Sequence, residues 1–223
     1  MIQMLNRENQ IKKGVTDNQE KRALTYHEIK RGIDVIVALL AIVLFAPVFL
    51  VTALAIYIED GAPVFFIQER NGLHGKIFRM YKFRSMCRDA AKIHQSLLAQ
   101  NELDGPAFKM KDDPRLTRVG KFIRKTSIDE LPQLLNILKG EMSIVGPRPL
   151  PTYETAELNE YQRQRMNVKP GLTCYWQCSG RNDIPFGEWM EMDMKYIEDE
   201  SIFTDARIMV KTVASVITGK GAC

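Results

Sequence analysis

Two adjacent carboxylates, Asp129 and Glu130, lie at the end of one of the most basic stretches of the chain. Seven Lys or Arg residues and two Asp occur between positions 109 and 125, and Gly146-Pro-Arg-Pro149 follows soon after the pair. Nearby cations favour the ionised form of a carboxyl group, and an ionised carboxylate can hold Mg²⁺ or attack phosphorus. The cations can meanwhile bind a nucleotide or phosphate. This pattern is expected of phosphoryl transfer, although a surface helix with ordinary ion pairs explains the charges equally well.

Further cations come from positions whose local structure would aim them. Residues 76–86 read as a strand, and side chains two apart on a strand share a face, so Lys82 and Arg84 could together grip a diphosphate. Arg148 stands between two prolines that restrict its backbone. Arg181 belongs to a polar loop that could meet a sugar or nucleotide. For each of these residues, simple solvation is the competing interpretation.

The local pattern around the acidic pair predicts a helix that begins there. Ser127-Ile-Asp-Glu130 fits the capping box S-x-x-E, Pro132 is tolerated only near a helix start, and Lys139-Gly140 is a plausible end. Glu130 could therefore be only a capping residue. The positive end of a helix also attracts phosphate, so capping and catalysis could coexist in the pair.

Composition and charge narrow the class of protein. The chain has 223 residues, of which 45% are hydrophobic and 26% charged, with a net charge of +4. This modest excess suits an anionic membrane surface or a nucleotide and does not demand nucleic acid. Four scattered Cys and three His, without a CxxC pair, argue against a zinc site and favour a reducing cytosolic setting. No P-loop or GxGxxG motif occurs.

An uncharged segment of 24 residues, Val35–Ile58, predicts membrane insertion, because about 20 apolar residues suffice to span a bilayer. It lacks the polar stripe of a soluble helix. Both flanks are basic, so both are expected on the cytoplasmic side. A helix broken at Pro47 could enter one leaflet and return; a single crossing is the alternative. Asp34, at the membrane edge, is expected to pair with Lys30 or Arg31.

The remaining pattern predicts an α+β, mostly helical fold. Residues 63–70 and 76–86 form a small β-hairpin around a turn-rich link, and a basic amphipathic helix near 116–124 suits a membrane interface. Further helices are expected near 89–101, 188–198 and 206–218, and a short strand near 172–177. The domains are a mobile polar N-terminus (1–29), a re-entrant membrane helix (30–60) and a cytosolic catalytic domain (61–223).

A set of short motifs in order along the chain resembles the bacterial sugar transferases, which are monotopic phosphoglycosyl transferases acting on polyprenyl phosphate. The motifs are Lys30-Arg-Gly-Ile-Asp34, Gln68-Glu-Arg-Asn-Gly72, Tyr81-Lys-Phe-Arg-Ser-Met86, Ser127-Ile-Asp-Glu-Leu-Pro-Gln133, Met142-Ser-Ile-Val-Gly-Pro-Arg-Pro149, Lys169-Pro-Gly171 and Ser179-Gly-Arg-Asn182. The resemblance covers position 30 to the C-terminus.

The resemblance implies transfer of hexose-1-phosphate from a UDP-sugar to undecaprenyl phosphate, with release of UMP, as the first membrane step of surface glycan synthesis. Asp129 would be the nucleophile that forms a covalent aspartyl intermediate, Glu130 its partner carboxylate, and Mg²⁺ the cofactor, bound by Asp129. Lys82, Arg124 and Arg148 match basic positions expected to hold phosphates.

The resemblance also implies a membrane helix broken at Pro47, an active site on the cytoplasmic face of the bacterial inner membrane, contact with membrane lipid, and a possible homodimer. Ala46 departs from the family, in which a polar residue often precedes that proline. The stretch around Trp176–Asn182 looks more like glucose- or galactose-transferring relatives. The alternative function is a non-catalytic, membrane-anchored basic module.

Overall fold

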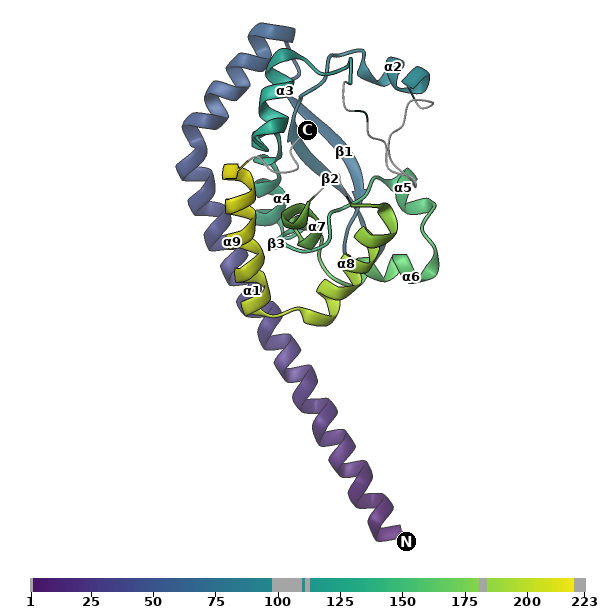
Figure 1. The fold of residues 1–223 in the computed structure, drawn as a ribbon. Coiled ribbons are helices and arrows are strands. Elements are labelled where there is room, and N and C mark those ends of the chain that lie inside the picture. The colour runs from purple at the N-terminus through teal and green to yellow at the C-terminus, as the bar shows by residue number, and fades with distance from the viewer. Residues whose placement is uncertain (1, 98–109, 111–112, 181–183, 219–223) are drawn as a thin grey trace.

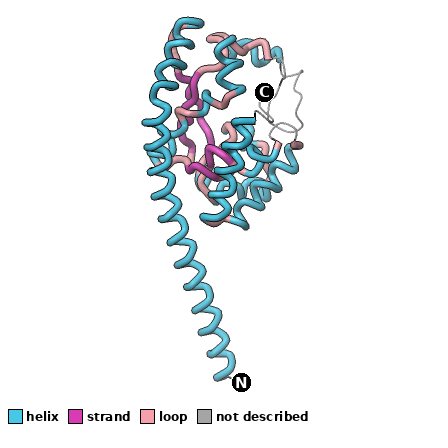
Figure 2. Tube along the Cα trace, turned by 60° about the vertical axis from the view of Figure 1, so that its left-hand side comes forward, coloured by secondary structure: helices cyan, strands magenta, loops and turns pink. Residues whose placement is uncertain are grey.

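A long N-terminal helix, α1 (Ile2–Asp60), runs along one side of the protein and projects beyond it. The computed structural model describes all residues except 1, 98–109, 111–112, 181–183 and 219–223, and describes only the backbone of 2–23, 94–96 and 216–218. The backbone is helical from Ile2 onward, and the mobility of residues 1–29 stays a prediction. Figures 1 and 2 show this part extending away from the globular part.

The apolar part of α1 is long enough to cross a membrane, and only 11% of its most apolar stretch is buried against the protein. A soluble core helix would bury much more, so this helix suggests membrane association. Pro47 lies inside α1 without ending it. The expected break is therefore corrected to a continuous helix, which curves in its blue part in Figure 1. Curvature suffices because a proline removes a single intrahelical hydrogen bond.

Polar contacts fasten the start of the apolar segment to the globular part. Arg31 donates to the carbonyls of Ile137 and Leu138 at 2.6 and 2.9 Å. These carbonyls lie near the end of α4 (Gln133–Lys139), where a cation is favourable. Lys30 pairs with Asp205 at 2.5 Å.

Asp34, which is 4% exposed, accepts hydrogen bonds from the Ser143 hydroxyl (3.0 Å) and the Ile144 amide (2.9 Å). The expected pairing of Asp34 with Lys30 or Arg31 is therefore wrong. Both cations have partners elsewhere, and the buried donors of the strand after α4 take the carboxylate instead.

The far end of the same segment is also attached. The carboxylate of Glu59 accepts the amides of Arg118 and Val119 at 2.8 and 3.0 Å. These amides open α3 (Arg118–Lys125), whose N-cap is Thr117. Arg84 and Asp60 form an ion pair at 3.1 Å. Both ends of the apolar segment thus contact one globular part.

The predicted hairpin is confirmed as β1 (Phe65–Asn71) and β2 (Ile77–Phe83), antiparallel, with Phe66 opposite Lys82. A short parallel sheet joins two strands that the sequence only partly indicated, β3 (Ser143–Val145) and β4 (Gly171–Thr173). The expected strand over 172–177 ends early because residues 175–179 are helical. The fold is thus α+β and mostly helical, with two small sheets.

The principal core lies where the hairpin, α4, β3 and the two last helices meet α1. Its largest buried members include Met80, Ile137, Met142, Tyr196 and Ile208. The other elements are η1 (Leu73–Gly75), α2 (Ala90–Leu97), η3 (Ile128–Glu130), α5 (Thr152–Ala156), α6 (Glu160–Arg163), η4 (Gln164–Asn167), α7 (Tyr175–Ser179), α8 (Phe186–Asp199) and α9 (Ile202–Thr218).

The attachment of α1 can be tested at Asp34. Asp34→Ala leaves two buried donors without their acceptor, so we expect a loss of about 1–3 kcal/mol in the free energy of unfolding. Equilibrium denaturation of the detergent-solubilised protein would measure it. Asp34→Asn, which keeps an acceptor oxygen, should lose less. Equal stability of the Ala variant and the wild type would show that this contact does not hold α1.

Candidate active site

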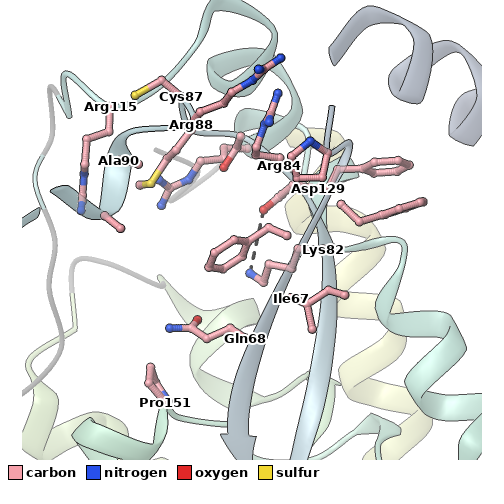
Figure 3. Close-up of a pocket in the computed structure, with 18 of the residues that line it drawn as sticks. Ile67, Gln68, Lys82, Arg84, Cys87, Arg88, Ala90, Arg115, Asp129 and Pro151 are labelled. Carbon is pink, nitrogen blue, oxygen red and sulfur yellow. Dashed lines mark ion pairs between the residues drawn. The ribbon is translucent and has the colours of Figure 1, made fainter. Parts of the chain in front are cut away.

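A cavity of about 870 Å³ opens beside the hairpin, and Asp129 forms part of its wall. Figure 3 shows it from the side on which Lys82 and Asp129 approach each other. Six of its lining side chains are cationic, and Asp129 and Glu154 are the acidic ones among the lining residues. The cationic residues are Arg70, Lys82, Arg84, Arg88, Arg115 and Arg124. Such a wall suits an anion with several phosphate oxygens.

The acidic pair lies in a single turn of 3₁₀-helix, η3, and not at the start of a capped α-helix. Ser127 makes no side-chain cap and adopts a left-handed backbone with φ of 57°, and α4 begins only at Gln133. The capping-box prediction is therefore wrong, because α4 takes Pro132 as its N-cap. A 3₁₀ turn rotates successive side chains by about 120°. Asp129 and Glu130 consequently point in different directions.

Glu130 is held by two cations. Its Oε1 accepts from the Lys82 ammonium at 2.9 Å and from an Arg148 guanidinium nitrogen at 2.7 Å. Its side chain is only 14% exposed. Charge-assisted hydrogen bonds of this kind stabilise the ionised form of a carboxylate that is largely removed from water. Glu130 is thus engaged by the protein itself and is not free to react.

Asp129 is placed differently. Its carboxylate faces the cavity, and its one ion pair with a described residue is the Lys82 ammonium at 3.9 Å. No hydrogen bond to its side chain occurs within the described residues. The pair therefore combines one saturated carboxylate with one that can contact a bound molecule.

The pKa values of the pair move in opposite directions. Burial alone would raise the pKa of Glu130, but the charges of Arg148 and Lys82 outweigh it and hold that pKa far below its usual range. The pKa of Asp129 is raised, because burial and the negative charge of Glu130 outweigh the Lys82 charge. The expectation that the cations stabilise both ionised carboxylates thus applies to Glu130 alone. The Asp129 carboxylate is the more basic and hence the better nucleophile.

Arg148 is fixed by residues that the sequence did not single out. The Arg165 guanidinium donates to the main-chain carbonyl of Arg148 at 2.7 Å. The same Arg165 guanidinium also donates to the Asp193 carboxylate at 2.6 and 2.9 Å. Arg70 donates to the carbonyl of Pro149 at 2.9 Å. Arg165 and Asp193 are 5% and 1% exposed. The predicted rigid turn is thus held by buried side chains as well as by its prolines.

A buried amide sets the hairpin against the acidic pair. Asn136, on α4, accepts from the Tyr81 amide at 3.0 Å and donates to the Arg79 carbonyl at 2.8 Å. Tyr81 and Arg79 both belong to β2. Tyr81 comes one residue before Lys82, and Arg79 comes three residues before it. Asn136 is fully buried. It thereby holds the strand that carries Lys82 against the helix that follows Glu130.

The structure gathers most of the predicted cations without giving them equal roles. Arg124 lines the cavity and forms neither a hydrogen bond nor an ion pair through its side chain with any described residue. Arg84 instead donates to the carbonyls of Asp60 and Gly61 at the end of α1 at 3.1 and 2.7 Å. Lys82 and Arg84 both line the cavity, and their joint grip on one diphosphate stays a prediction. Arg181 lies outside the described residues.

The number of carboxylates near the cavity limits how the implied magnesium ion could be bound. No group of three or more His, Cys, Asp or Glu that could hold a metal occurs among the described residues. Mg²⁺ is usually bound by one or two carboxylates together with substrate phosphates. Asp129 supplies one such carboxylate. The residues present therefore fit an ion that arrives with a phosphate substrate.

Comparisons with known proteins show which family the chain resembles. A family model described as bacterial sugar transferase matches residues 25–219. Galactosyl transferase CpsE of Streptococcus agalactiae serotype III is 46% identical over 86% of this chain and 43% of that protein. Undecaprenyl-phosphate galactose phosphotransferase of Salmonella typhimurium is 37% identical over 93% of this chain and 44% of that protein. Exopolysaccharide production protein ExoY of Rhizobium meliloti is 38% identical over 86% of this chain and 87% of that protein. The chain thus spans less than half of the first two relatives.

Removal of the Glu130 charge should destabilise the protein. Glu130→Gln leaves Arg148 without its ion-pair partner and Lys82 with only the more distant Asp129 carboxylate at 3.9 Å, so we expect a loss of about 3 kcal/mol in the free energy of unfolding. The exposed Glu157→Gln should change it by less than about 0.5 kcal/mol. Because the partners interact, Lys82→Met combined with Glu130→Gln should lose less than the sum of the single losses. Strict additivity would contradict the buried pairing.

Glu154 should make stability depend on pH. Burial raises the pKa of Glu154 to about 7, although Arg70 opposes the shift. A raised pKa means that the folded state binds more protons, so this contribution to stability is complete below pH about 4.5 and is lost as pH rises through about 7. The advantage of Glu154→Gln over the wild type should therefore grow by roughly 3 kcal/mol across that window. A pH-independent difference between the two proteins would contradict it.

Proposed function

The chain belongs to the bacterial sugar transferase family, and from this premise we propose that it transfers a sugar-1-phosphate from a UDP-sugar to undecaprenyl phosphate and releases UMP. Names of relatives support both substrates. The Salmonella typhimurium relative is an undecaprenyl-phosphate galactose phosphotransferase. One from Erwinia amylovora is a UDP-galactose-lipid carrier transferase. The reaction would be the first membrane step of exopolysaccharide, capsule, O-antigen or glycoconjugate synthesis.

The observation that carries the proposal is the difference in hydrogen bonding between the two carboxylates of the acidic pair. Glu130 is saturated by Lys82 and Arg148, whereas Asp129 faces the cavity without a hydrogen bond from any described residue. A carboxylate reserved in this way suits covalent catalysis. A simple lipid-binding module would need the cations, but it would not need an unengaged carboxylate among them.

In the first half of the reaction, an Asp129 carboxylate oxygen attacks the sugar-bearing phosphorus of the UDP-sugar. A bond forms between phosphorus and that oxygen, and the bond from phosphorus to the bridging oxygen breaks. UMP leaves with the electron pair of that bond. The protein then carries the sugar phosphate on Asp129.

In the second half, a phosphate oxygen of undecaprenyl phosphate attacks the same phosphorus. The bond from phosphorus to Asp129 breaks, which restores the free carboxylate and yields the lipid diphosphate sugar. The cationic wall would neutralise the phosphates in both halves. Lys82 lies next to Asp129, and Arg124 offers an unengaged guanidinium.

We assign Glu130 a positioning role, since it holds Lys82 and Arg148 in place. We propose Mg²⁺ as cofactor, held by Asp129 and the substrate phosphates. When bound, it would neutralise charge on the phosphoryl oxygens. Whether the protein acts as a homodimer is a separate proposal, which the named relatives do not address.

The placement of α1 supports an active site on the cytoplasmic face of the bacterial inner membrane. Both ends of its apolar segment contact the same globular part. If α1 crossed the bilayer, that part would have to lie within about 30 Å of hydrocarbon, which its polar surface excludes. We therefore propose that α1 enters and leaves by the cytoplasmic face, as its basic flanks predict. Exposed Phe122 on α3 supports an interfacial position for that helix.

The decisive test is Asp129→Asn. We expect it to lower lipid-dependent UMP release by at least about 1,000-fold, because it removes the nucleophile. The assay uses detergent-solubilised protein, Mg²⁺, undecaprenyl phosphate and a panel of UDP-sugars. Exposed Asp199→Asn is the matched control and should keep full activity.

Other outcomes identify the competing functions. Activity retained by Asp129→Asn would refute the nucleophile assignment. Free phosphate in place of lipid-linked sugar would indicate a phosphatase that uses an aspartyl phosphate. A folded wild type that is inactive with every UDP-sugar, yet binds anionic vesicles, would favour the non-catalytic membrane module.

A further inference from the structure

The cavity has two chemically different ends. Figure 3 shows three arginines on one side of the Lys82–Asp129 ion pair, and these are Arg84, Arg88 and Arg115. Gln68 and Pro151 lie on the other side of the pair. The arginine end suits the phosphates and the rest of the nucleotide. The opposite end must then face whatever the reacting phosphorus carries on its other side.

The hairpin register places Gln68 at a suitable distance from the reacting groups. Phe66 lies opposite Lys82, and Gln68 is two residues further along β1 on the same face. Two residues of strand correspond to about 7 Å, a separation that a single pyranose ring can bridge. Gln68 Oε1 accepts from Arg70 at 2.6 Å, which leaves its amide nitrogen to donate on the side of the Tyr153 hydroxyl and the cavity.

The cation at this end is already engaged. One terminal nitrogen of Arg70 donates a hydrogen bond to the Pro149 carbonyl, and the other donates to Gln68 Oε1. Arg70 therefore orients Gln68 and Pro149, and it is a single cation against the three arginines of the opposite end. Arg70 also pairs through its backbone with Pro151, which fixes α5 against β1. This bridge brings the first turn of α5 to the cavity.

Glu154, on that turn of α5, is 7% exposed and lines the cavity. A carboxyl group here disfavours a diphosphate, because like charges repel. It accepts hydrogen bonds well from hydroxyl groups. A buried acceptor discriminates strongly between a ligand that supplies a hydroxyl and one that does not, since the unpaired acceptor is costly.

We propose that the β1–α5 end of the cavity binds the sugar of the donor, and that Glu154 and Gln68 determine which hexose is accepted by hydrogen-bonding to its ring hydroxyls. The proposal rests on the proposed function for the identity of the donor as a UDP-sugar. It adds the location of the sugar and the residues that select it. Hexose epimers differ in the direction of one hydroxyl, so one misplaced acceptor suffices to distinguish them.

The test measures binding without turnover. In an Asp129→Asn background, dissociation constants are measured for UMP, UDP-galactose, UDP-glucose and their two N-acetylated counterparts. Glu154→Gln is compared with Glu157→Gln, which alters an exposed carboxylate on the same segment and outside the cavity. We expect Glu154→Gln to change the affinity ratio of at least one sugar pair by about 10-fold or more. UMP, which lacks the sugar, should keep its affinity within about 2-fold.

The outcomes separate this proposal from the function on which it rests. Unchanged sugar ratios in Glu154→Gln, equal losses for UMP and all UDP-sugars, or no UDP-sugar binding at all would each overturn the sugar site. A selective change in the ratios would support it even if the wild type transferred nothing to undecaprenyl phosphate. In that case the proposed function would fail and the sugar site would stand. Gln68→Glu should also alter the ratios, because it replaces two donors by acceptors.

Discussion

The partly buried charge of Glu130 is the constraint around which the site is organised. A carboxylate so little exposed must be neutralised, and the two cations that do so come from distant parts of the chain, Lys82 on β2 and Arg148 after β3. Satisfying this one group therefore brings the hairpin, η3 and the Gly146–Pro149 turn together. Because both cations are used on Glu130, its neighbour Asp129 remains available beside the cavity.

Buried polar residues then hold the partners of Glu130 in place. Asn136 ties α4 to the strand that carries Lys82, and Arg165, clamped by Asp193, holds the backbone of Arg148. Each is buried and hydrogen-bonded, as a rigid polar network requires. Such an arrangement suits phosphoryl transfer, in which the protein contributes mainly positioning and charge.

In the proposed function, the attachment of α1 connects this site to the lipid substrate. Arg84 binds the end of α1 and also lines the cavity. The end of the apolar helix and the cationic wall of the cavity therefore share one side chain. A lipid phosphate presented at the bilayer surface would meet the proposed nucleotide-binding cavity where α1 ends.

Local pattern alone was sufficient for several elements. Uncharged Val35–Ile58 indicated the apolar helix, and the turn residues after Arg70 indicated the hairpin, because composition and short-range spacing determine these features. The adjacent Asp129 and Glu130 among cations marked only a candidate site, since ordinary ion pairs give the same pattern. Tertiary contacts decided the rest. The capping motif at Ser127 yielded to a 3₁₀ turn, and Asp34 took buried donors of β3 in place of its sequence neighbours. Glu154, Arg165 and Asn136 carried no local signal, because their roles arise from partners brought close only by packing.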